Sequence, residues 1–95
     1  MPKLVQTSGD QAGREIDLVV GSNTIGRDLS NHIVVHSSGV SRHHAEIRIG
    51  SDVILRDLGS TNGTYVNGTL IAEQPLRDGA VITIGSTNLT FRSAI

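Results

Sequence analysis

Apolar residues recur at every second position in short runs along this chain, and this period most constrains the fold. In the range 45–49, three apolar residues alternate with two charged ones. The ranges 14–20, 53–56, 81–84 and 89–91 follow the same pattern. Alternation over such short runs is typical of strands with one buried face. No segment shows a sustained helical period, so the sequence predicts an all-β chain.

Dipeptides that favour turns lie between or beside these runs. They are Gly9-Asp10, Gly21-Ser22, Gly50-Ser51, Asn67-Gly68, Asp78-Gly79 and Gly85-Ser86. Asn67-Gly68 lies between Tyr65-Val66 and Leu70-Ile71, and this arrangement is the strongest short-range indication of a β-hairpin. Many short strands joined by regular turns predict an antiparallel β-sandwich or barrel.

Composition limits the possible functions. The chain has 95 residues, enough for one domain spanning 1–95. It has no cysteine, which excludes disulfides and thiolate metal sites and favours a reducing, cytoplasmic location. A net charge of -1 and only two aromatic residues argue against binding to nucleic acid or to an anionic membrane. No apolar run is long enough for a signal peptide or a membrane span. We expect a monomer.

Three polar segments interrupt the strand pattern and contain most of the candidate ligands. They cover residues 26–32, 36–44 and 57–64, and each is rich in hydrogen-bond donors. A rigid sandwich that presents polar loops is a common way to build a binding surface. We therefore expect the functional site on these loops.

The motifs in these segments resemble those of forkhead-associated (FHA) domains. Gly26-Arg27 is followed by Ser41-Arg42-His43-His44, then by Ser60-Thr61-Asn62-Gly63 and the turn Val66-Asn67-Gly68. The resemblance has its core at 25–68, and we expect it to extend over the whole chain. It implies an antiparallel β-sandwich of about eleven short strands, of the FHA/SMAD-like type, with binding loops at one end. It also implies a partner that carries phosphothreonine, and hence a Ser/Thr kinase upstream.

The chemistry of phosphothreonine suits these residue types. The phosphate carries about -1.5 to -2 charges at neutral pH and three strong acceptor oxygens. Arg27, which follows the flexible Gly26, can supply two parallel charge-assisted bonds. The hydroxyl of Ser41 can donate to another oxygen, and Asn62 has both a donor and an acceptor for a peptide main chain.

The resemblance assigns a role to each matching position. The expected phosphate ligands are Arg27, Ser41, Arg42 and Thr61. Asn62 is expected to hold the peptide backbone. The expected structural residues at the site are Gly26, His44, Asp57, Ser60 and Gly63. His43 occupies a variable position of the family and receives no role.

Metal binding and catalysis are weaker interpretations of the same residues. His32 and His36 would lie about 13 Å apart on a strand, too far to share one ion, so no metal or other cofactor is expected. Ser41, His44 and Asp57 match the residue types of a catalytic triad, but no nucleophile elbow surrounds the serine. We therefore expect no enzyme.

The main alternative is an interaction module that does not depend on phosphorylation. The same sandwich could bind a partner, or itself, through a sheet face or an edge strand. In that case the motif residues would serve only the structure of the loops.

Overall fold

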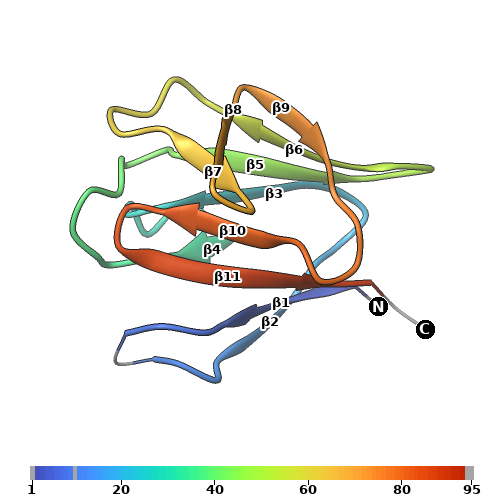
Figure 1. Ribbon diagram of the computed structural model, residues 1–95, viewed down its shortest axis with the longest axis horizontal. Helices are drawn as coiled ribbons and strands as arrows, with labels where there is room; N and C mark the ends of the chain where they lie inside the picture. The colour runs from blue at the N-terminus through green and yellow to red at the C-terminus, as the bar shows by residue number, and fades with distance from the viewer. Residues whose placement is uncertain (1, 10, 94–95) are drawn as a thin grey trace.

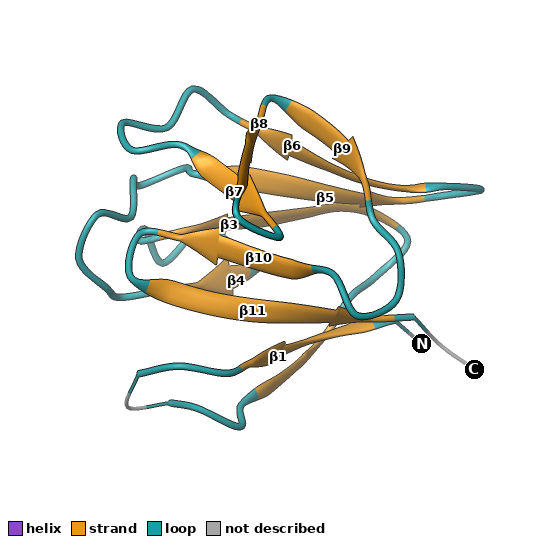
Figure 2. Ribbon diagram, in the orientation of Figure 1, coloured by secondary structure: helices purple, strands orange, loops and turns teal. Residues whose placement is uncertain are grey.

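The computed structural model describes residues 2–9 and 11–93, and all of its regular secondary structure is β-strand (Figure 2). The eleven strands are β1 (Lys3–Gln6), β2 (Glu15–Asp17), β3 (Gly21–Gly26), β4 (Ile33–Val34), β5 (Ala45–Ile49), β6 (Val53–Asp57), β7 (Thr64–Val66), β8 (Thr69–Ile71), β9 (Glu73–Pro75), β10 (Val81–Ile84) and β11 (Thr87–Arg92). The all-β expectation is thereby confirmed. No helix long and apolar enough to cross a membrane occurs in these two ranges.

The strands form two sheets that pack face to face (Figure 1). The six-stranded sheet has the order β2-β1-β11-β10-β7-β8, and the five-stranded sheet has the order β4-β3-β5-β6-β9. Neighbouring strands run antiparallel except β3 and β4, which are parallel. The loop 27–32 doubles back and places Ile33 beside Ile25, so this one pair differs from the expected antiparallel arrangement.

The three polar segments and the β10–β11 turn lie at one end of the sandwich (Figure 1). The β4–β5 loop contacts that turn, because the Ser86 N–H donates to the Ser38 carbonyl at 3.0 Å. At the opposite end Lys3 pairs with Arg92, so the first and last strands begin and end side by side there. The polar loops therefore lie at the opposite end of the sandwich from the start of β1 and the end of β11.

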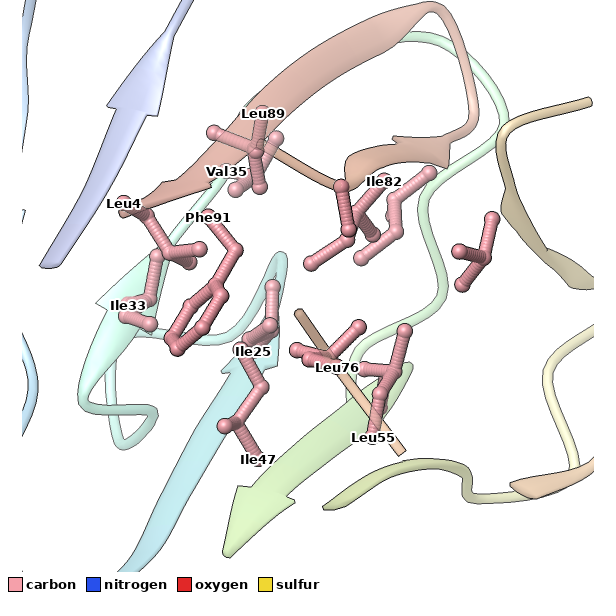
Figure 3. Close-up of a cluster of buried hydrophobic side chains, with 14 of the residues drawn as sticks. Leu4, Ile25, Ile33, Val35, Ile47, Leu55, Leu76, Ile82, Leu89 and Phe91 are labelled. Carbon is pink, nitrogen blue, oxygen red and sulfur yellow. The ribbon is translucent and has the colours of Figure 1, made fainter. Parts of the chain in front are cut away.

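Inward-facing side chains of both sheets form one core (Figure 3). The side chains labelled there are Leu4, Ile25, Ile33, Val35, Ile47, Leu55, Leu76, Ile82, Leu89 and Phe91. Full burial of each large aliphatic or aromatic side chain contributes about 1.5–3 kcal/mol. The alternation in 45–49 is confirmed, since Ala45 and Ile47 are buried while Arg48 is exposed.

The alternation in 14–20 is only partly confirmed. Strand β2 ends at Asp17, and the chain then crosses from one sheet to the other. Leu18 is buried as expected, but Val20 is 80% exposed. Gly21-Ser22, expected as a turn, instead begins β3. The crossing accounts for both differences, because the inward and outward faces are redefined where the chain changes sheet.

The Asn67-Gly68 hairpin has the geometry expected from its sequence. Asn67 has φ 51° and Gly68 has φ 84°, and the two residues join β7 to β8. Positive φ at both central residues suits the twist of a two-residue hairpin. The turn expected at Gly9-Asp10 falls partly outside the described residues, because Asp10 is not among them.

Asn23 fixes the crossing between the sheets from inside. Its side chain is fully buried, although it lies in the middle of β3. Its Oδ1 accepts from the Val19 N–H at 2.8 Å, and its Nδ2 donates to the Val19 carbonyl at 2.9 Å and the Ile47 carbonyl at 3.1 Å. This amide satisfies main-chain groups that a buried apolar residue would leave without partners.

Asn23→Ala is expected to lower the free energy of unfolding by about 2–4 kcal/mol, because buried main-chain groups would lose their partners. The measurement is urea unfolding, with the midpoint shifted and the slope unchanged. Ser22→Ala, at the exposed neighbouring position, is the matched control and should change stability much less. Equal effects of the two substitutions would contradict the role given to Asn23.

Candidate functional site

His44 joins two of the polar loops from inside the protein. It directly precedes β5, and its side chain is completely buried. The ring Nδ1 accepts from the Ser41 N–H at 3.1 Å, and Nε2 lies 2.8 Å from the Gly63 carbonyl. A main-chain N–H only donates and a carbonyl only accepts, so the ring is neutral with its proton on Nε2. This geometry supports the structural role expected for His44.

Gly26 allows the β3–β4 loop to lie against the β4–β5 loop. The Arg27 N–H donates to the Ser41 carbonyl at 3.0 Å, and the Asp28 N–H donates to the Arg42 carbonyl at 3.2 Å. A Cβ at Gly26 would lie 2.1 Å from the Arg42 carbonyl oxygen. The close approach of the two backbones therefore requires glycine here, which supports the structural role expected for Gly26 and gives a reason for it other than flexibility.

Asn31, which was not among the predicted site residues, reinforces this contact. Its side chain is 6% exposed, and its Nδ2 donates to the Asp28 carbonyl at 2.8 Å and the Arg42 carbonyl at 2.7 Å. In the sequence Asn31 is one polar residue in a polar loop. Only its spacing after Asp28, typical of side chains that bond nearby backbone, could have indicated it.

Ser41 and Thr61 come together as expected. The Thr61 N–H donates to the Ser41 Oγ at 3.0 Å. This bond occupies an acceptor site of the hydroxyl and leaves the Ser41 O–H proton available for another acceptor. Ser41 is half-buried and Thr61 is exposed, so the pair lies at the rim of the loops.

Asn62 lies on the same rim and faces the β4–β5 loop. Its Nδ2 donates to the Gly39 carbonyl at 3.0 Å. Gly39 has φ 85°, a left-handed conformation that favours glycine. With one amide hydrogen engaged in this way, Asn62 retains its carbonyl oxygen as a potential acceptor for a main-chain N–H.

Asp57 organises the β6–β7 loop. Its Oδ1 accepts from the Ser60 hydroxyl at 2.5 Å and the Thr64 hydroxyl at 2.7 Å. Its Oδ2 accepts from the N–H groups of Gly59 at 3.0 Å and Ser60 at 3.1 Å. The Ser60 Oγ in turn accepts from the Gly63 N–H at 3.0 Å. Asp57 and Ser60 thus occupy positions that suit the expected loop braces.

The hydrogen bonds to Asp57 lower the pKa of its carboxyl group. Burial alone raises this pKa, because it disfavours the charged form. The bonds from Ser60, Thr64 and the main-chain N–H of Gly59 outweigh that effect. The carboxylate is therefore more stable in the folded chain than in the unfolded chain.

Gly63 also has a conformational reason for its position. It has φ 87°, and a Cβ there would lie 2.6 Å from the Leu70 Cδ1. The positive φ confirms the turn conformation expected of Gly63. Its carbonyl accepts the hydrogen bond from the His44 Nε2–H.

The two arginines of the motif are exposed and form no ion pair within the part of the chain that the structure describes. The ion pairs in that part are Lys3–Glu15 and Arg92–Asp78, and neither involves Arg27 or Arg42. The loop does carry one nearby carboxylate, Asp28. Hydrogen bonds from Ser30 lower the pKa of Asp28, and the charges of His43 and Arg42 lower it further.

The three residues that match a catalytic triad do not form a relay. His44 accepts from the main chain of Ser41 rather than from its hydroxyl, and its other nitrogen bonds Gly63. Asp57 is engaged by Ser60 and Thr64. The arrangement instead presents cations, a hydroxyl and an amide on preformed loops, which suits binding of an anion.

An all-β sandwich with braced polar loops at one end defines a class of binding domain. Comparison of the chain with known protein families identifies that class. The family model described as FHA domain matches residues 23–85. The chain belongs to the FHA domain family.

Relatives of known description agree with this membership. The FHA domain-containing protein FhaA of Mycobacterium tuberculosis is 44% identical over 84 residues, which is 87% of this chain and 16% of that protein. The glycogen accumulation regulator GarA of Mycolicibacterium smegmatis is 36% identical over 89 residues, covering 93% of this chain and 56% of GarA. This chain thus spans a minor part of FhaA and about half of GarA.

Solved structures share the fold over nearly its full length. The FhaA FHA domain complexed with the intracellular domain of Rv3910 has a TM-score of 0.89 at 41% identity, covering 97% of this chain and 100% of that one. Mycobacterium tuberculosis EmbR in complex with a low affinity phosphopeptide has a TM-score of 0.87 at 35% identity, covering 96% of this chain and 24% of EmbR.

His44→Ala is expected to lower the free energy of unfolding by about 2–4 kcal/mol, since it leaves a cavity and two main-chain groups without partners. Thermal and urea unfolding measure the change. His43→Ala is the matched control, because His43 is adjacent but exposed and should change stability little. A normal unfolding midpoint for His44→Ala would contradict the structural role.

Asp57→Asn is expected to destabilise the protein most at neutral pH. Because the folded-state pKa of Asp57 is lowered, its stabilising contribution is complete above the ordinary value of about 3.9 and is lost as the pH falls through the lower folded value. Urea unfolding over a pH series should show wild type and variant converging in acid. A difference that stays constant down to strongly acidic pH would refute this account.

Proposed function

We propose that this chain is a phosphothreonine-binding module that recognises a phosphorylated partner protein. Arg27, Ser41, Arg42 and Thr61 are its proposed phosphate ligands, and Asn62 is the proposed ligand of the partner's main chain. The observation that carries the proposal is the pair of hydrogen bonds that Ser41 accepts. Its hydroxyl is held by the Thr61 N–H, while its carbonyl accepts from the Arg27 N–H, so one residue connects the expected ligands.

The chemistry of the loops suits a phosphate dianion. Two exposed guanidinium groups that form no ion pair in the described residues supply positive charge and forked donors. The Ser41 O–H adds a donor whose direction the Thr61 bond restricts. Because hydrogen bonds already hold the loops in place, little ordering cost remains for binding.

Structures of family members support the proposal. EmbR was solved in complex with a phosphopeptide, and another similar structure concerns phosphothreonine-dependent FHA domain interactions, with a TM-score of 0.91 at 40% identity. FHA domains are binding modules. We propose that residues 1–95 form a single domain of this kind and that it has no catalytic activity. The proposal also includes a Ser/Thr kinase that phosphorylates the partner. It further includes a monomeric, cytoplasmic protein that binds neither nucleic acid nor membrane.

A partner that binds without phosphorylation is the competing possibility, and one observation favours it. Leu70, 61% exposed, lies opposite Tyr65 on the outer surface of the six-stranded sheet. Val81, 36% exposed, adds to the apolar area of the same sheet. Such a surface could bind a protein without a phosphate, and the experiment below separates the two functions.

The deciding experiment is calorimetric titration with peptide libraries that differ only in the fixed residue: phosphothreonine, phosphoserine or threonine. The phosphothreonine library is expected to bind, and the phosphoserine library to bind more weakly by about 1 kcal/mol, the value of one buried methyl. Arg27→Ala should weaken binding by about 3 kcal/mol or more, because it removes charge-assisted hydrogen bonds.

The matched control is Arg48→Ala, which removes an exposed arginine from β5, away from the polar loops. It should bind the phosphothreonine library like the wild type. Unchanged affinity of Arg27→Ala would refute the site. No binding of any library by folded protein would refute the function and favour the phosphorylation-independent alternative.

A further inference from the structure

A hollow of about 540 Å³ opens beside the proposed phosphothreonine site. Gln6, Gly9, Gln11 and Arg14 line it on one side, and the chain from Val34 to Ser38 and the start of β11 line it on the other. None of the expected phosphate ligands lines it, but Leu29 and Ser38 do. These two residues belong to the loops that also carry Arg27 and Ser41, so the hollow adjoins the proposed site.

Arg14 supplies the positive charge of this hollow. It is half-buried just before β2, and its Nη2 donates to the Val34 carbonyl at 3.2 Å. Its Nε–H is shielded from solvent and finds no hydrogen-bond acceptor among the described residues. No carboxylate of those residues forms an ion pair with it. A partly desolvated guanidinium with no ion-pair partner among the described residues is costly, and an anion bound by it would offset that cost.

The rest of the lining favours an anion over a cation. No acidic side chain occurs among the described residues that line the hollow. Ser37 accepts from the Thr87 hydroxyl at 2.7 Å, which leaves its own O–H free to donate. Gln11 and His36 also line the hollow, both are exposed, and both side chains carry N–H groups.

We propose that this hollow is a second anion site, which receives a carboxylate or a second phosphate carried by the same partner that presents the phosphothreonine. Arg14 binds the oxyanion with its guanidinium, and the Ser37 hydroxyl assists. The inference rests on the proposed function, because the phosphothreonine holds the partner against the loops. A second group on the same chain then binds at a high effective concentration. The hollow therefore determines which phosphorylated sequences bind best.

The test uses peptides with one phosphothreonine and otherwise neutral residues. A glutamate is moved through successive positions on either side, with glutamine at the same position as the reference. A second series carries phosphoserine against serine and distinguishes a phosphate from a carboxylate. At one or two positions the acidic peptide should bind wild type about fivefold to tenfold more tightly than its neutral reference, as for a partly buried charge pair.

Arg14→Gln should abolish this gain and still bind the neutral phosphothreonine peptide like the wild type. Arg48→Gln is the matched control and should retain the gain. His36→Glu provides a second variant, independent of the bond from Arg14 to Val34. It places a negative charge at the hollow and should also remove the preference. Near-ultraviolet circular dichroism establishes that each variant is folded.

The outcomes separate this inference from the proposed function. If wild type binds the neutral phosphothreonine peptide and no acidic position improves its affinity, the second site is refuted and the proposed function stands. A gain in affinity from the acidic residue that persists in Arg14→Gln and His36→Glu likewise refutes the hollow as the second anion site. If folded wild type binds no phosphothreonine peptide at all, both proposals fail.

Discussion

The buried imidazole of His44 is the interaction on which the loop structure depends. Its two ring nitrogens bond the main chain of the β4–β5 and β6–β7 loops. The main-chain N–H of His44 donates to the Ile25 carbonyl, and its main-chain carbonyl accepts from the Leu58 N–H. One residue thus connects the two loops to strand β3 of the five-stranded sheet. Because these partners are main-chain groups, the connection fixes loop positions without depending on which side chains the loops expose.

The loops separate interactions that hold them in place from groups that remain available to a ligand. The groups that brace the loops include the buried amide of Asn31 and the half-buried carboxylate of Asp57. The exposed cations Arg27 and Arg42 lie outside them. The charge of the site is therefore local, since the whole chain carries a net charge of -1. A local cluster of this kind attracts a compact dianion without the long-range field that favours a polyanion.

The sequence predicted those parts of the molecule that depend on neighbours along the chain. Alternation identified the inward residues of β5, and Asn67-Gly68 identified a hairpin, because strand faces and tight turns follow local rules. Strand β3 was not predicted, since its buried position 23 is an asparagine whose partners become evident only when the sheets are assembled. The close approach at Gly26 and the contacts of Asn31 likewise depend on Arg42, which is distant in sequence.

The pairing of Lys3 with Arg92 has a consequence for how this domain can be connected to others. Flanking polypeptide on either side would leave from one place, at the end of the sandwich opposite the polar loops (Figure 1). A domain with adjacent points of entry and exit can be inserted into a host chain with little disturbance of either. In this geometry any attachment would lie at the end of the sandwich opposite the polar loops and would leave those loops uncovered.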